Sequence, residues 1–373
     1  MVHRNPCPPK YRIPDMSTST EWVSDRERFA ALAASWETLV KGWGTPFDRH
    51  PWFAAWWDAF AARRKLRICA LWDEGELVAI VPLCRRGRAL EPMANVHSPF
   101  FRPLARDEAA LRTLLTEVFR EARGSLALPA VPVDDPSFQA LREAAAPARW
   151  MWIDEATHTS PIVEIDGSYE AYRERMRSRW SSAERKARKM RREYRARFEL
   201  VAPPTNLEAQ LRRGFAVEAS GWKGRAGTAI ESSAETLTFY RSVAAAFERT
   251  GELRLSEISL DGRTVAFDLS LLSDGRLYLL KTGYDEAYGW LSPGLVLQQE
   301  VVKTCFGLGL DAYELLGDEA DWKRRFATAS RAHRDARAYE RTPAQVTRYA
   351  YRRLARPRLR SAYRTLRAAR SAA

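Results

Sequence analysis

Apolar and polar positions along the first half of the chain predict helices that alternate with short strands. Two apolar runs, Leu66–Trp72 and Glu76–Leu83, flank the turn Asp73-Glu-Gly75, a pattern typical of a β-hairpin. This half is therefore expected to be a mixed α/β unit. The other elements that periodicity predicts here are helices at 25–41, 51–64, 107–122 and 136–147 and a strand at 125–133.

The second half repeats this order with stronger strand signals. Three apolar runs, Leu253–Leu260, Thr264–Leu272 and Arg276–Thr282, are joined by Asp261-Gly262 and by a turn ending at Asp274-Gly275. Asp-Gly between apolar runs is a strong short-range hairpin signal, so these runs predict an antiparallel meander. The other predicted elements are helices at 168–195, 206–219, 234–250 and 294–307, strands at 197–201 and 311–316, and a glycine-rich loop at 220–228.

The two halves share one short motif, an apolar run followed by a turn with Gly and a run containing Val-Ala. It occurs at 72–79 and again at 260–266. This repeat predicts two copies of one fold in tandem, each a mixed sheet flanked by helices. The expected organisation is a disordered extension at 1–20, an N-terminal domain at 21–155, a C-terminal domain at 156–330 and a basic tail at 331–373.

Charge is concentrated in two segments. The net charge is +13, but residues 331–373 carry +11 and residues 173–197 carry +9, which leaves −7 for the remainder. Such basic segments suit anionic partners, including phosphates, acidic lipid headgroups, nucleic acid and acidic saccharides, although a solvated helix face explains 173–197 equally well. The tail at 346–370 interleaves aromatic residues and Leu with Arg, which is compatible with a peripheral helix on an anionic membrane, although Pro357 interrupts it.

Several classes of protein are disfavoured. No window of 18 apolar residues exists, and the Pro-rich, polar N-terminus does not resemble a signal peptide. The four cysteines are scattered and the five histidines lack ligand spacing, so we expect reduced thiols, a cytoplasmic location and no metal.

The most informative stretch of the sequence is a strand that leads through a loop into a helix start. The strand contains Leu280, Lys281 and Thr282, and the helix start is Ser292-Pro-Gly294 followed by Leu295. Ser can cap a helix, Pro293 suits the first turn, and Gly lets a ligand approach the backbone. A helix start of this kind can bind phosphate, although an ordinary capped helix is the simpler interpretation.

Five blocks of residues carry a resemblance to a known family. Residues 217–326 resemble the acetyltransferase domain of the CelD/BcsL type in the GNAT superfamily, and the whole layout is similar to the Fem-type aminoacyltransferases, which pair two GNAT-like units. The superfamily's longer phosphate loop is reduced here to Ser-Pro-Gly. The blocks are Glu218–Ile230, Asp261-Gly262 with Val265–Phe267, Lys281–Asp285, Ser292–Gly294, and Leu316-Gly317 with Trp322-Lys323.

The resemblance implies acyl transfer from acetyl-CoA or another acyl-CoA to an amine. The pantetheine arm would pair with the strand at 276–282, and the pyrophosphate would rest on the N–H groups of Ser292, Gly294 and Leu295. Candidate bases are Asp268 and Asp285, with Tyr284 as a candidate acid, although a solvent-facing Asp268 and a turn-capping Asp285 are equally plausible.

Three readings of the function follow. The first is an N-acetyltransferase acting on a saccharide or cell-envelope precursor, since the resembled family is linked to exopolysaccharide and cellulose synthesis. Trp222, Lys223 and Lys323 would contact that acceptor, although Trp222 also suits a loop anchor. The second is Fem-like transfer from aminoacyl-tRNA, although we expect nucleic acid not to be a partner. The third is a non-catalytic scaffold near a synthase at the inner face of the membrane.

Overall fold

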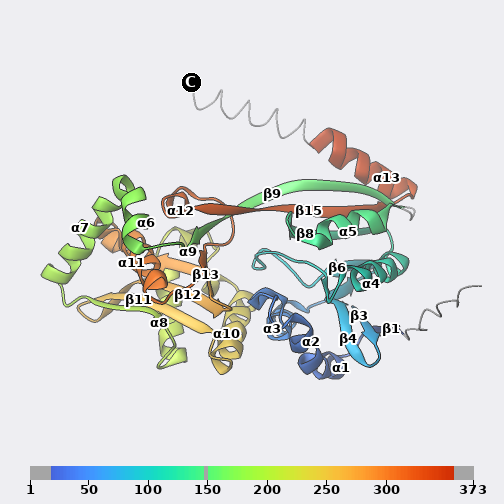
Figure 1. Cartoon of the computed structure of the whole chain (residues 1–373), viewed down its shortest axis with the longest axis horizontal. Helices are drawn as coiled ribbons and strands as arrows, with labels where there is room; N and C mark the ends of the chain where they lie inside the picture. The colour runs from blue at the N-terminus through green and yellow to red at the C-terminus, as the bar shows by residue number, and fades with distance from the viewer. Residues whose placement is uncertain (1–17, 147–149, 357–373) are drawn as a thin grey trace, which may run out of the picture.

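The protein is described by a computed structural model, which covers residues 18–146 and 150–356. Its two halves lie side by side along the longest axis, and two long strands cross above both of them (Figure 1). Helices and mixed sheets occur in both halves, so the predicted mixed α/β class is confirmed.

The N-terminal half contains two small sheets flanked by helices. In the larger sheet, strands pair in the order β1-β3-β4-β7, and β3 and β4 form the predicted hairpin. The strands are β1 (Ser19–Val23), β2 (Lys65–Leu66), β3 (Ile68–Asp73), β4 (Glu76–Val81), β5 (Leu83–Arg86), β6 (Ala89–Pro92) and β7 (Leu104–Ala105). The helices are α1 (Arg26–Ala31), α2 (Ala33–Val40), α3 (His50–Phe60), α4 (Glu108–Glu121) and α5 (Pro136–Ala145).

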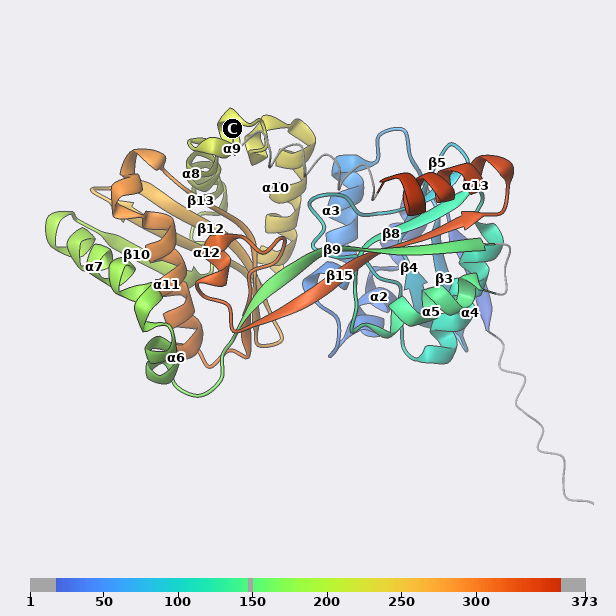
Figure 2. The same ribbon diagram turned by 90° about the horizontal axis from the view of Figure 1, so that it is seen from above.

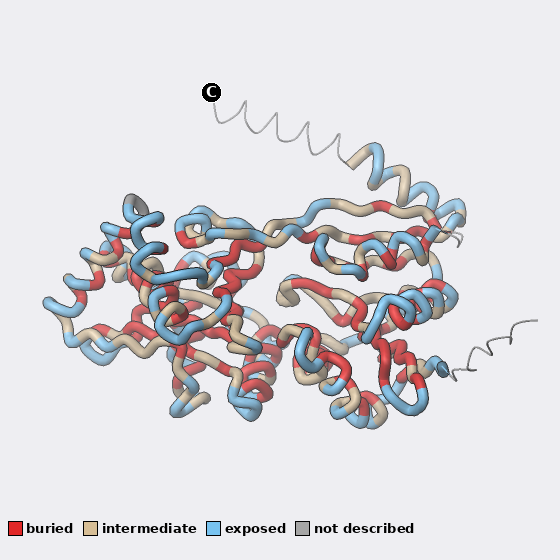
Figure 3. Tube along the Cα trace, in the orientation of Figure 1, coloured by how far each residue is buried: buried red, intermediate tan, exposed pale blue. Residues whose placement is uncertain are grey.

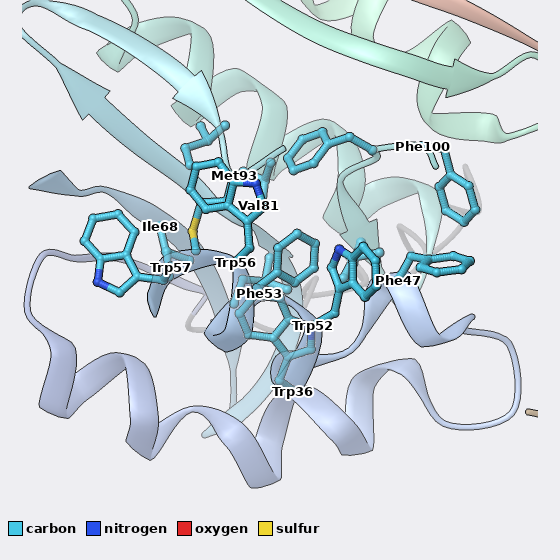
Figure 4. Close-up of a cluster of buried hydrophobic side chains, with 14 of the residues drawn as sticks. Trp36, Phe47, Trp52, Phe53, Trp56, Trp57, Ile68, Val81, Met93 and Phe100 are labelled. Carbon is cyan, nitrogen blue, oxygen red and sulfur yellow. The ribbon is translucent and has the colours of Figure 1, made fainter. Parts of the chain in front are cut away.

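Tryptophan and phenylalanine side chains from α2 and α3 fill the core of this half (Figure 4). Trp36, Trp52 and Trp56 are all fully buried. The ring of Trp52 lies edge-on to Phe47 at 4.9 Å and to Phe239 of α10 (Ala234–Arg249) at 5.1 Å between centroids. Because Phe239 belongs to the second half, the aromatic core continues across the boundary between the halves.

The C-terminal half is built on a sheet whose strand order is β10-β11-β12-β13-β14-β9-β15-β8. The predicted meander is present, and both Asp-Gly turns have positive φ at Asp and Gly, as a type I′ hairpin requires. The strands are β8 (Ser125–Pro132), β9 (Trp150–Glu164), β10 (Arg197–Ala202), β11 (Leu253–Leu260), β12 (Arg263–Ser273), β13 (Arg276–Tyr284), β14 (Ala312–Glu314) and β15 (Ala329–Glu340).

Helices cover both faces of the meander (Figure 2). On one face, α8 (Leu207–Ala219) and α10 pack against β11–β13, and on the other α11 (Pro293–Gly307) packs with α7 (Arg177–Glu193). Because side chains alternate along a strand, Phe267 faces α8 while Asp268 faces α11. The single helix expected at 168–195 is interrupted at Met176, which separates α6 (Tyr169–Arg175) from α7.

The long strands β9 and β15 span both halves and place β8 of the N-terminal half in the same sheet as the meander. They pair with each other along their lengths, β9 also pairs with β14, and β15 also pairs with β8 (Figures 1 and 2). The boundary expected at 155/156 lies within β9 and the one at 330/331 lies within β15. Residues 331–340, grouped above with the basic tail, thus form most of a strand whose buried residues are His333, Ala336, Ala338 and Tyr339.

Beyond β15 the chain continues as α13 (Pro343–Ala350) and a short π-helix at Tyr351–Ala355. Arg352 and Arg356 fold back onto Glu155 of β9, with shortest N–O distances of 2.7 and 3.0 Å. The remainder of the proposed membrane-facing segment, 357–370, lies outside the described residues. Within the described part, no helix has the length and apolarity needed to cross a bilayer.

Candidate active site

A cavity of about 460 Å³ opens beside the C-terminal end of β13. Its wall contains seven of the residues singled out from the sequence: Trp222, Lys223, Thr282, Tyr284, Ser292, Gly294 and Leu295. The other lining residues are Glu218, Gly221, Gly283, Glu286, Gly289, Gln298, Asp321, Trp322 and Arg325. Segments separated by a hundred residues in the sequence therefore converge on one space.

Two parallel strands separate at this cavity. β13 pairs with β14 only from Arg276 to Tyr278, after which β13 continues to Tyr284 while β14 ends at Glu314. The chain then turns away through Leu316 and Gly317, which both have positive φ. Within the described residues, the β13 edge therefore has no strand partner on this side beyond Tyr278, and it can accept an added strand.

The start of α11 forms another wall of the cavity. Ser292 is left-handed (φ 49°), and its hydroxyl does not cap the helix but accepts a hydrogen bond from Lys186 Nζ at 2.5 Å. The backbone N–H groups of Gly294 and Leu295, in the first turn, have no partner within the helix. Together with the positive end of the helix dipole, they can bind an anion. The N–H of Ser292, which the sequence analysis also assigned to the pyrophosphate, instead donates to the backbone oxygen of Gly289 at 2.9 Å.

Asp268 lies beneath the cavity and is completely buried on β12. Its Oδ2 accepts a hydrogen bond from Gln298 Nε2 at 2.7 Å, and it is the register partner of Thr282. Burial raises the pKa of Asp268 to about 7, against the opposing effects of the Thr282 hydroxyl, the Gln298 amide and the charge on Lys223. The alternative prediction that Asp268 faces solvent is therefore wrong. Thr282 and Gln298, which line the cavity, lie between it and the Asp268 carboxyl group.

Asp285, the second candidate base, has structural partners. Its carboxylate accepts hydrogen bonds from Arg263 at 2.7 Å and from the backbone N–H of Ala287 at 3.0 Å. It is buried and does not line the cavity. The neighbouring Tyr284 does line it, and 39 % of that residue is exposed.

Leu280 and Lys281 lie away from the cavity, although they are next to Thr282 in sequence. Leu280 packs against the core shared with the N-terminal half. Lys281 Nζ lies 4.8 Å from the ring centroid of Tyr240 on α10, and burial lowers the pKa of this lysine. The register of β12 and β13 shifts at Leu280, and this β-bulge interrupts the alternation of side chains, so Leu280 and Lys281 both lie away from the face on which Thr282 lines the cavity.

Glu218 was missed as a site residue by the sequence reasoning. It is 3 % exposed, and its carboxylate accepts hydrogen bonds from Lys223 Nζ at 3.1 Å and from the backbone N–H of Ile230 at 2.9 Å. Lys223 Nζ also donates to the backbone oxygen of Thr282 at 2.7 Å. A glutamate on the apolar face of a helix, next to Val217, was the available signal.

Lys323 approaches the separated strands from the β14 side. Its Nζ donates a hydrogen bond to the backbone oxygen of Leu316, and burial lowers the pKa of Lys323 to about 8. Lys323 does not line the cavity, although its neighbour Trp322 does. Among the described residues, no three His, Cys, Asp or Glu side chains are placed to hold a metal ion.

Comparison with known proteins identifies the class of this half. Residues 175–324 match the family described as "Acetyltransferase (GNAT) domain", so the chain contains a GNAT-superfamily acetyltransferase domain. Comparison with curated proteins gives no match. The specific CelD/BcsL type stays a prediction.

Three solved structures share the fold across both halves. The C-terminal domain of a protein described as a lysylphosphatidylglycerol synthetase from Agrobacterium fabrum has a TM-score of 0.54 at 12 % identity, over 86 % of this chain and 95 % of that one. FemX gives 0.54 at 11 % identity, over 85 % and 96 %. L-PGS from Bacillus licheniformis gives 0.53 at 12 % identity, over 89 % and 96 %. These likenesses establish the fold alone, and they extend well beyond the matched domain, in agreement with the predicted tandem layout.

Proposed function

We propose that this protein is an acyl-CoA-dependent N-acyltransferase that acetylates an amino group on a saccharide or a cell-envelope precursor. The single observation that carries the proposal is the meeting of two features in one cavity. The β13 edge beyond Tyr278, which has no β14 partner within the described residues, and the uncapped first turn of α11 both open into it. An amide-containing arm attached to a pyrophosphate needs this combination of an edge and a positively polarised helix end.

The residues present fit acyl-CoA. The N–H groups of Gly294 and Leu295 would hold the pyrophosphate. Gly294 permits close approach, because a Cβ there would already lie 3.1 Å from the ring of Tyr284. When bound, acyl-CoA supplies an activated carbonyl group that an amine can attack.

Side chains of this protein can accept and donate the protons of the reaction and can hold the backbone beside the acceptor. Asp268, with a pKa of about 7, is suited to take the amine proton near neutral pH, and the Thr282 hydroxyl links it to the cavity. Tyr284 lines the same space, and its hydroxyl can donate a proton to the leaving sulfur. The ion pair of Lys223 and Glu218 holds the Thr282 backbone oxygen in place.

Aromatic side chains at the cavity support a saccharide acceptor. Trp222 lines the cavity and is 58 % exposed, and Trp322 lines it from the opposite segment. Exposed indole rings suit stacking on the apolar face of a sugar. The resemblance to enzymes linked to exopolysaccharide synthesis favours the same class of acceptor.

A second candidate, transfer from aminoacyl-tRNA, is supported by the basic helix α7 beside the start of α11. The folds shared with FemX and with lysylphosphatidylglycerol synthetases agree with it. Titration calorimetry with acetyl-CoA separates the two: binding at micromolar to millimolar concentration supports the first candidate. No heat with acetyl-CoA, together with salt-sensitive retention of tRNA, would replace it by the second.

A further inference from the structure

A cationic and aromatic surface lies next to the cavity rim and takes no part in the chemistry described above. Lys186 of α7 contacts Ser292 at the rim, and one turn further Lys189 places its Nζ 4.6 Å from the ring centroid of Trp290. Trp290 is 53 % exposed and is flanked by Tyr194, with 6.5 Å between ring centroids. We call Lys186, Lys189 and Trp290 the rim surface.

The charges around the rim surface leave it positive. Lys186 makes no ion pair within the described residues, while Lys189 has the Glu193 carboxylate at 3.6 Å, and Glu193 also pairs with Arg192. On the adjoining faces of α7, Arg185 and Arg188 are exposed, and neither forms an ion pair within the described part of the chain. An anion here would meet uncompensated positive charge beside an accessible indole ring.

An indole ring flanked by lysines is suited to a phosphorylated nucleoside. The ring stacks with a base, and the lysines form charge-assisted hydrogen bonds with phosphate. The α11 start and the rim surface share Ser292 as a boundary, so a ligand whose pyrophosphate lies at Gly294 can extend its nucleoside over this surface.

We propose that the rim surface binds the 3′-phosphorylated adenosine of CoA and makes the enzyme selective for CoA over 3′-dephospho-CoA. This inference rests on the proposed acyl-CoA function. Adenine stacks on Trp290, and Lys186 and Lys189 share the 3′-phosphate. The basic helix α7, which a solvated helix face would also explain, thereby has a specific ligand.

The experiment compares acetyl-CoA with acetyl-3′-dephospho-CoA by titration calorimetry on the full chain. The unaltered protein is expected to bind acetyl-CoA about tenfold more tightly, since hydrogen bonds to charged groups are the stronger class. In the double variant Lys186→Ala/Lys189→Ala this ratio falls to about one, because affinity for acetyl-CoA drops while affinity for the dephospho form changes little.

Two further variants serve as controls. Lys186→Arg/Lys189→Arg keeps the charge and should restore most of the selectivity. Lys303→Ala removes a lysine from α11 that lies over Tyr169 instead, and it should keep the full ratio.

The other outcomes overturn either the inference about the rim surface alone or the proposed acyl-CoA function together with it. Equal binding of the two thioesters by the unaltered protein, or an unchanged ratio in the alanine double variant, overturns the inference and leaves the acyl-CoA function intact. Absence of binding by both thioesters overturns the proposed function and the inference with it. Tighter binding of a single-stranded RNA oligonucleotide than of acetyl-CoA, lost in the double variant, assigns the rim surface to RNA instead.

Discussion

The two halves of the molecule differ in what they bury. Among described residues 18–146, whose buried positions are red in Figure 3, the buried polar or charged side chains are Asp48, Asp73 and Ser137. Aromatic rings fill much of the core of this half (Figure 4). In residues 207–314 the buried polar or charged side chains are Gln210, Glu218, Thr236, Ser256, Glu257, Thr264, Asp268, Ser270, Asp285, Gln298, Gln299 and Glu314.

This difference indicates that the C-terminal half tolerates destabilising buried polar groups because its site needs them. Burying a carboxylate costs free energy unless it is well paired, so such groups accumulate where a site needs them. Asp48 in the N-terminal half is paired on several sides, by Arg102 at 2.6 Å and by the backbone N–H of Thr45 at 2.8 Å. Asp268 in the C-terminal half has one oxygen without a hydrogen-bond partner.

The largest expected effect tests the N-terminal core. Trp52→Ala removes a fully buried ring that touches Phe47 and Phe239, so the free energy of unfolding should fall by about 3–5 kcal/mol. Urea denaturation measures the loss. Trp222→Ala, at an exposed position, is the matched control and should change stability by less than about 0.5 kcal/mol. Equal losses in the two variants would contradict the comparison of the halves.

The next prediction concerns Asp268→Asn, which should slow acetyl transfer by about a hundredfold or more, the usual contribution of a general base. For the unaltered enzyme, kcat/KM should rise with pH up to about 7 and then level off. In contrast, Asp285→Asn should weaken the helix cap at Ala287 and the ion pair with Arg263, and the rate of acetyl transfer should stay within a few-fold of that of the unaltered protein. Steady-state kinetics across pH decides, and a rate unaffected by Asp268→Asn would remove its role as base.

Asp268→Asn, which is expected to slow the reaction, should make the folded protein more stable at high pH. The pKa of Asp268 is raised from 3.8 in the unfolded chain to about 7, so the folded state holds its proton more tightly between those values. Stability contributed by this group is therefore lost as pH rises from about 4 to about 7, by about 4 kcal/mol at most. Asp268→Asn should raise the melting temperature at pH 8 relative to the unaltered protein but not at pH 4. Identical shifts at both pH values would contradict the assigned pKa.

A smaller effect is expected at the start of α11. Gly294→Ala places a methyl group 3.1 Å from the Tyr284 ring, next to the N–H groups proposed to hold pyrophosphate, so acetyl-CoA should bind about tenfold more weakly. Gly307→Ala, at the other end of α11, meets no atom within 4 Å and is the control. Calorimetry should show a loss only for Gly294→Ala.

The smallest expected effect is a difference in stability between two variants, one at the start of α10 and one at the start of α11. Ser233 caps α10 by accepting a hydrogen bond from the Thr236 N–H, so Ser233→Ala should cost about 1 kcal/mol of stability. Ser292→Ala removes no cap and should cost clearly less. Thermal unfolding of both variants tests the claim that the α11 start is left open for a ligand, and an equal cost in both would contradict it.

Much of the fold was predictable because the relevant signals are local. The Asp-Gly turns at Asp261 and Asp274 and the apolar runs between them specified the meander that carries the site. Strands β9 and β15 were not predicted, since their neighbours lie more than a hundred residues away and charged residues interrupt their apolar pattern. Alanines that are buried on β15 carry little hydrophobic signal in a sequence.

The site was predictable as a location more than as a set of contacts. Ser292, Gly294 and Thr282 line the cavity because backbone conformation places them there, and turn and cap residues report that conformation. Gln298 lines it through tertiary packing, which no local pattern in the sequence encodes, and the local sign of Glu218 was its place on the apolar face of a helix. The face on which Lys281 lies depended on strand register, where a shift of one residue would reverse it.

The pairing of β9 with β15 affects how the protein folds during synthesis and where it can be truncated. β8, which precedes β15 by about two hundred residues, is hydrogen-bonded to the sheet through β15, near the end of the described chain. On the ribosome, the last strand must therefore emerge before the sheet can close, and shortened proteins ending near residue 330 would leave two long edges without partners.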